Sequence, residues 1–221
     1  MAVAYQAIGT PNAVNRGTLV CAWPTHAIGD IGFLAIEVDA DAATFSVSGW
    51  THVSGSPVTG TGTKLQVYYR VATSAAEADV SNYNGGTHQF GVIATVRGAA
   101  SVSPINATAT GTTDGQLPAL TTTAGNCAIL IFVARGDDDA GAQFSVWSYP
   151  STSALVEVLD EGTTEGAGGG LGIAWGQKIS TGSTSTGSVT YAGASTTATI
   201  VVAIRPSLLA GSNAFFMGAD F

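Results

Sequence analysis

Two glutamates are the only pair of side chains whose placement suggests catalysis. Glu37 lies near the end of the run 30–38, and Glu157 takes a comparable place in the run 154–160 of the second half. Glycoside hydrolysis uses two carboxyl groups held at a defined separation across a groove. Glu37 is flanked by apolar residues, so it is expected to be partly buried, and no other pair of acids suggests an active site. We therefore predict no catalytic residues, and we predict that the protein is not an enzyme.

The histidines and cysteines do not have the spacing that a metal site or a thiol-based active site requires. His26, His52 and His88 are not arranged like the ligands of a zinc site, and each is expected on a strand or at the surface. Cys21 and Cys127 are far apart in the sequence; two free buried thiols are favoured, with pairing left open. No G-x-S-x-G nucleophile motif occurs. The sequence thus predicts no metal site and no cofactor.

Three short motifs admit chemical interpretations that their context does not support. The stretch GAGGGLG at 166–172 looks like a phosphate-binding loop, but a strand follows it where a helix is required, which favours a turn or a close approach of strands. The aspartates 137–139 are consecutive, whereas calcium ligands alternate, so a solvated turn is expected. Arg135-Gly136-Asp137 spells a cell-adhesion tripeptide, which three residues produce by chance.

Aromatic side chains offer a binding alternative. Trp50, Trp147 and Trp175 could form a carbohydrate-binding surface, because aromatic rings stack on the faces of sugars. In a β-sheet protein such residues more often pack in the core or at a sheet edge. A glycan ligand is therefore the weaker of two interpretations of these tryptophans.

Charge limits the partners of the chain. Its 221 residues include 15 acidic and 7 basic residues, a net charge of −8, and only 10% of residues are charged against the usual ~25%. Nucleic acids and anionic membranes require basic surfaces, so neither is an expected partner. No apolar stretch approaches the ~18 residues of a membrane span, and the first residues lack the pattern of a signal peptide. Such a weakly charged surface suits a subunit of a larger assembly, and many secreted β-proteins share it.

Many short strands must position these residues. The 29 glycines separate runs rich in Val, Ile, Thr, Tyr and Phe, which is typical of an all-β protein. The first half predicts strands at 30–38, 48–53, 64–71 and 89–97. One short helix is expected over 72–80, with Ser74 as its cap and Glu77 as the capping-box partner.

The second half of the chain repeats this pattern at a nearly constant separation. The corresponding segments are 127–135, 154–160, 172–180 and 198–205. Two four-strand units predict an antiparallel eight-strand β-sandwich that resembles a jelly roll, although chance similarity between strands is an alternative. The expected divisions are an N-terminal segment 1–17, the sandwich 18–206 with halves 18–98 and 126–206 joined by a linker 99–125, and a C-terminal tail 207–221.

The tail is apolar and must be buried somewhere. It contains Phe215, Phe216, Met217 and Phe221 and little charge. The two main alternatives are packing on its own domain and docking onto a neighbouring subunit.

The order of four motifs resembles that of bacteriophage virion structural proteins. The motifs are GDIGFLAIEV, SGWTHVSGSP, GTKLQVYYRVATSA and HQFGVIATVRGA, and the resemblance covers Thr18 to Pro206. It implies a virion component made in the host cytoplasm, tail-associated or in a fibre, that acts through subunit packing. A capsid decoration protein and a carbohydrate-binding module in host recognition are the alternatives. The implied partners are further copies of the chain, with a trimer favoured, and other virion proteins; no catalytic residues carry over.

Overall fold

The computed structural model describes residues 2–207 apart from 45, 85 and 194–196. All regular elements in this part of the chain are β-strands, which confirms the predicted all-β class. The described residues form nineteen strands, where eight were expected, because the connections between the long strands contain short strands of their own. This part of the chain contains no helix that is long and apolar enough to cross a membrane.

The first half of the chain forms one antiparallel sheet. Its strands lie in the order β1 (Ala4–Ile8), β9 (Gln89–Arg97), β4 (Ile31–Val38), β7 (Lys64–Val71) and β5 (Thr51–His52). Two short strands extend it: β2 (Asn12–Val14) pairs with β9, and β6 (Val58–Thr59) pairs with β7.

The second half forms a second antiparallel sheet. The order is β10 (Ile105–Gly111), β19 (Thr197–Ile204), β13 (Cys127–Arg135), β16 (Gly169–Lys178) and β15 (Val156–Thr163). Strands that the sequence paired hold equivalent places in the two sheets: β4 and β13, β5 and β15, β7 and β16, β9 and β19. Residues 4–14 and 105–111 supply the corresponding edge strands β1, with β2, and β10.

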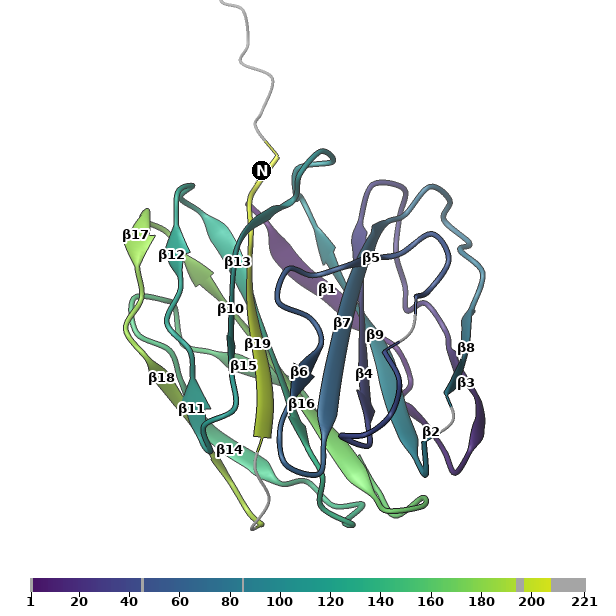
Figure 1. Cartoon of the computed structure of the whole chain (residues 1–221). Coiled ribbons are helices and arrows are strands. Elements are labelled where there is room, and N and C mark those ends of the chain that lie inside the picture. The colour runs from purple at the N-terminus through teal and green to yellow at the C-terminus, as the bar shows by residue number, and fades with distance from the viewer. Residues whose placement is uncertain (1, 45, 85, 194–196, 208–221) are drawn as a thin grey trace, which may run out of the picture.

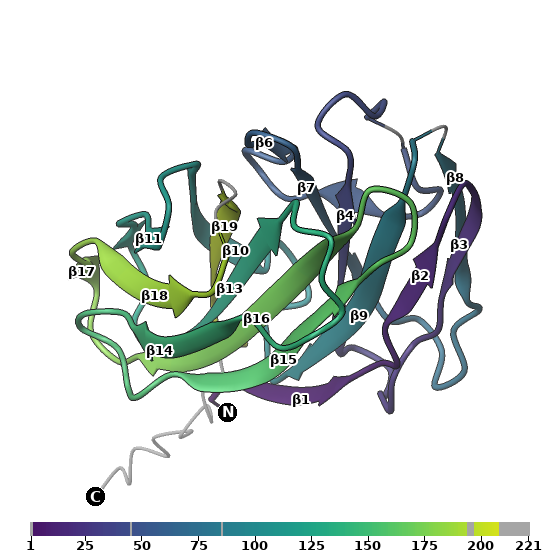
Figure 2. The same cartoon turned by 90° about the horizontal axis from the view of Figure 1, so that it is seen from below.

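Short strands cover the outer face of each sheet. The first sheet is covered by β3 (Gly17–Cys21) and β8 (Val80–Asn84). The second is covered by β11 (Gln116–Leu117), β18 (Gly187–Tyr191) and β14 (Phe144–Ser148), and by the pair β12 (Thr121–Thr122) and β17 (Gly182–Ser183). The views in Figures 1 and 2 show these strands at opposite sides of the molecule, with the two large sheets between them. The chain thus forms four layers.

Three hydrophobic clusters fill the spaces between the four layers. The central cluster lies between the large sheets, where the rings of Phe33 and Phe132 are 6.1 Å apart. Alternate residues of one strand point to opposite faces, so Leu34 and Ile36 pack under β3–β8 while Ile129 and Ile131 pack under β14 and β18. Both faces of β4 and β13 are therefore buried, which explains their continuous apolar sequences.

The predicted helix over 72–80 does not form. Instead, the Glu77 carboxylate accepts hydrogen bonds from the backbone N–H groups of Thr73 and Ser74 and pairs with Arg70 at 2.8 Å. These contacts fix a bent loop, and a segment this short has too few backbone hydrogen bonds to sustain an isolated helix. The sequence correctly indicated an interaction between Ser74 and Glu77, but this interaction closes a loop and does not begin a helix.

Both cysteines are free and buried. Cys21 belongs to the cluster under β3–β8 and Cys127 to the cluster under β14–β18, so the two large sheets separate them. Burial raises the pKa of Cys21 to about 12, so its thiol stays protonated and unreactive.

Candidate functional site

Two acids and a histidine meet where β4 ends and β9 begins. Glu37 and Asp39 are two residues apart, so both point to the same face as the central cluster. The pairing of Val38 with Gln89, the first residue of β9, places His88 directly before this strand and opposite Asp39. The local pattern E-x-D after an apolar run is visible in the sequence, but only the strand register brings His88 to it.

The imidazole of His88 lies between the two carboxylates. Its Nε2 atom is 3.0 Å from Glu37 Oε1 and 2.9 Å from Oε2, and its Nδ1 atom is 3.0 Å from Asp39 Oδ1 as an ion-pair contact. Thr63 Oγ1 donates a 2.9 Å hydrogen bond to Glu37 Oε1. Thr87 donates to Asp39 Oδ2 through its backbone N–H and its hydroxyl group. Every carboxylate oxygen in the cluster thus has a partner.

Burial and charge act in opposite directions on these groups. Burial raises the pKa of Glu37 to about 7, although His88 and Thr63 act against it. Burial alone would lower the pKa of His88, but the hydrogen bond and charge of Glu37, followed by those of Asp39, raise it above its ordinary value. The pKa of Asp39 is lowered, because the Thr87 hydrogen bonds and the His88 charge outweigh burial. Glu37 and His88 therefore release their protons at higher pH than isolated side chains of these types, and Asp39 releases its proton at lower pH.

Glycines of the 166–172 stretch close this cluster on the side of the second sheet. A Cβ atom at Gly169 would lie 2.2 Å from Glu37 Oε2 and 2.7 Å from His88 Nε2. One at Gly170, on the other face of β16, would lie 2.9 Å from Nε of Arg135. The glycine-rich stretch is thus a close approach of strands, as one of the two sequence interpretations predicted, and no helix follows it.

Arg135 is fully buried, so the Arg-Gly-Asp tripeptide is not an accessible adhesion motif. Its Nη2 atom donates to the carbonyl oxygens of Asp139 (2.9 Å) and Gly141 (3.2 Å), and its Nη1 atom lies 3.8 Å from Asp137 Oδ2. The aspartate turn therefore folds around an arginine.

Within the part of the chain that the structure describes, no group of three or more acidic, histidine or cysteine side chains could hold a metal ion.

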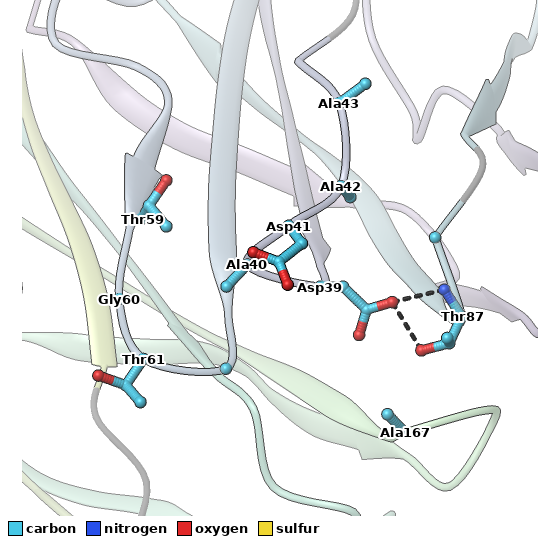
Figure 3. Close-up of a pocket in the computed structure, with 12 residues that line it drawn as sticks. Asp39, Ala40, Asp41, Ala42, Ala43, Thr59, Gly60, Thr61, Thr87 and Ala167 are labelled. Carbon is cyan, nitrogen blue, oxygen red and sulfur yellow. Dashed lines mark hydrogen bonds between the residues drawn. The ribbon is translucent and has the colours of Figure 1, made fainter.

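An open hollow of about 950 Å³ lies beside the buried cluster (Figure 3). Asp39, with 22% of its side chain exposed, connects the two, because it contacts His88 on one side and borders the hollow on the other. The described lining consists of small and polar residues: Asp39, Ala40, Asp41, Ala42, Ala43, Thr59, Gly60, Thr61, Gly62, Gly86, Thr87 and Ala167. Carboxylates and hydroxyl groups can bind hydroxyl-bearing ligands through hydrogen bonds. None of these lining residues is aromatic or cationic.

The structure does not bring the two glutamates of the hydrolase hypothesis to a common groove. Glu37 is buried against His88, whereas Glu157 is exposed on β15 and accepts a 2.6 Å hydrogen bond from Trp147 Nε1. The arrangement required for glycoside hydrolysis is therefore absent from this pair.

The three tryptophans lie at separate places. Trp175 is paired with Val156, and Trp147 is bonded to the next residue, Glu157, so the two rings lie on opposite faces of the second sheet. Trp50 packs beside the cluster under β3–β8, on the far side of the first sheet. They do not share one binding surface.

The other two histidines also lie apart from the cluster. His26 Nδ1 is 2.7 Å from the carbonyl oxygen of Pro24, and the ring of His52 packs 4.2 Å from that of Tyr68. His52 lies on β5, as predicted for a strand residue, and His26 is half-buried between β3 and β4. His88 is almost fully buried and precedes β9, contrary to the prediction. The tail residues proposed for docking, Phe215, Phe216, Met217 and Phe221, lie outside the described residues.

Comparisons with known proteins identify no relative of this chain, so the interpretation of the site rests on the residues described above. A scan against family models found no match, and searches of curated proteins and of solved structures also found none.

Proposed function

We propose that this protein is a structural component of a bacteriophage virion, tail-associated or part of a fibre, and that it acts through subunit packing. The observation that carries the proposal is the four-layer construction, in which both large sheets are covered on both faces. Such a unit has a rigid interior and presents short loops and outer strands to neighbours. The motifs that resemble virion proteins occupy β4, β5, β7 and β9 of this unit.

The surface chemistry supports an assembly role. Only 10% of the 221 residues are charged, a smaller share than the surface of a soluble monomer usually carries, so much of the surface is neutral and can contact neighbouring subunits. We propose a homo-oligomer with closed symmetry, a trimer in a fibre, together with contacts to other virion proteins. A capsid decoration protein has the same requirements and is the alternative position on the particle.

The shared strand order supports a finer proposal about the fold. Strands β4, β5, β7 and β9 and their equivalents β13, β15, β16 and β19 are proposed to be two copies of one unit that together form an eight-strand sandwich. Because each half stays within its own sheet, the likeness to a jelly roll rests on the face-to-face packing of the two sheets. The remaining strands extend this sandwich at its edges and outer faces.

The hollow beside Asp39 favours one second candidate function, glycan binding in host recognition. Its carboxylates and threonine hydroxyls can bind sugar hydroxyls, without the aromatic platform expected from the tryptophans. A glycan array tests this candidate, with Asp41→Asn as the variant, because Asp41 is exposed in the hollow and outside the buried cluster. Binding that the variant loses supports it; no bound glycan removes it.

Mass spectrometry of gradient-purified phage particles tests the structural proposal. The chain should be present in a fixed number of copies per particle, comparable to other structural proteins. Abundance in infected-cell lysate with none in particles would overturn the proposal.

A further inference from the structure

A groove of about 630 Å³ lies at the end of β19, where the described chain stops. Its described lining includes Val102, Asn126, Arg205 and Ser207, together with small residues and Pro206. Val102 is 78% exposed, and Ile179, whose carbonyl oxygen accepts a hydrogen bond from the Asn126 N–H, is 71% exposed. Two of the most exposed apolar side chains of the described residues are therefore at or beside this groove.

The chain outside the structure begins at the groove itself. Residues 208–221 follow Ser207, and their large apolar side chains are Leu208, Leu209, Phe215, Phe216, Met217 and Phe221. Burying aromatic side chains of this size is favourable, since each removes roughly 150–250 Å² from water. An apolar groove and an apolar segment are thus adjacent along one chain.

We propose that this groove binds the segment Phe215–Met217 of the same chain. Phe215 is eight residues beyond Ser207, so the connection spans at most ~29 Å when extended and can return over a shorter distance. Gly211, Ser212 and Asn213 are residue types that favour a turn. A segment tethered this closely has an effective concentration of about millimolar at its own groove, which favours it over a segment from another copy.

Arg205 supplies a polar contribution to the same site. It is the only charged side chain among the described lining residues. Its Nε atom is buried without a hydrogen-bond partner in the described part of the chain, and its Nη2 atom makes only a 3.4 Å contact with the Ile105 carbonyl oxygen. A carbonyl oxygen of the bound segment would satisfy the Nε donor. The charge also complements Asp220, the only charged side chain of residues 208–221.

Disulfide trapping in the full-length chain tests this inference, which does not depend on the proposed function. The test variant combines Val102→Cys with Phe216→Cys, and the control combines Val146→Cys with Phe216→Cys. Val146 is 76% exposed on β14, away from the groove, and the native cysteines are buried. A disulfide requires Cα atoms within about 7 Å of each other. The test pair should form an intramolecular disulfide at least tenfold faster than the control pair under mild oxidation.

Two outcomes would overturn the proposal. Equal rates for the test and control pairs would show that the segment has no preference for the groove. A disulfide-linked dimer as the main product would show that the groove receives the segment of another copy.

A second measurement avoids dependence on disulfide geometry: alkylation of the Val102→Cys thiol should be several-fold faster when Phe215→Ser and Phe216→Ser are also present. An unchanged alkylation rate would contradict the proposal.

Discussion

Gly169→Ala should strongly destabilise the protein. The new Cβ atom would lie 2.2 Å from Glu37 Oε2, more than 1 Å inside ordinary contact. The backbone of β16 cannot easily retreat, because β13 and β15 pair with it on both sides. Overpacking of this kind costs about 1–3 kcal/mol, and displacement of the buried bond between Glu37 and His88 costs a further ~1.5–3 kcal/mol. The expected loss in the free energy of unfolding is the sum of the two, about 2.5–6 kcal/mol.

Urea denaturation at pH 7 measures this loss, and Gly111→Ala provides the matched control. Gly111 also lies in a strand of the second sheet, but a Cβ atom there would meet only Pro118, at 3.6 Å or more. The control should stay within about 0.5 kcal/mol of the native protein. If the free energy of unfolding of Gly169→Ala also lies within about 0.5 kcal/mol of the native value, β16 does not require glycine beside the buried cluster, and the reasoning fails.

Three further predictions concern the buried polar groups and thiols. The pKa values of Glu37 and His88 are raised above their unfolded values, so the folded protein holds extra protons. The free energy of unfolding should therefore fall as pH rises from 4.5 to about 7, by about 3 kcal/mol from Glu37 alone. Urea denaturation from pH 4.5 to 8 measures this, and a flat or rising profile would contradict it. Arg135→Met should cost about 2 kcal/mol, because two carbonyl oxygens lose their donor; thermal unfolding that matches the native protein would refute that role. Cys21 and Cys127 should resist alkylation in the folded protein and react only on unfolding; rapid labelling of either under native conditions would show that its cluster is open.

The long strands were predictable because their signal is local. β4 and β13 are uninterrupted apolar runs, and the alternating pattern of β7 also marks a strand. The outer layers were not predictable in the same way, since several of their strands have only two residues. Nothing in two residues distinguishes a strand from a turn.

The buried cluster was missed because it depends on long-range pairing. Glu37 was recognised as a partly buried acid, but His88 is 51 residues away and joins it only through the pairing of β4 with β9. Gly169 meets both from the other sheet. A histidine considered alone is more often a surface residue, and only the register of the strands shows that this one is buried between two carboxylates.

Immunogold electron microscopy of purified phage particles, with an antibody against this chain, tests the central claim most directly. The account predicts label at regular positions on the tail or its fibres. Label on the head would instead identify a capsid decoration protein. Particles without label, from cells in which the chain is abundant, would contradict a structural role in the virion.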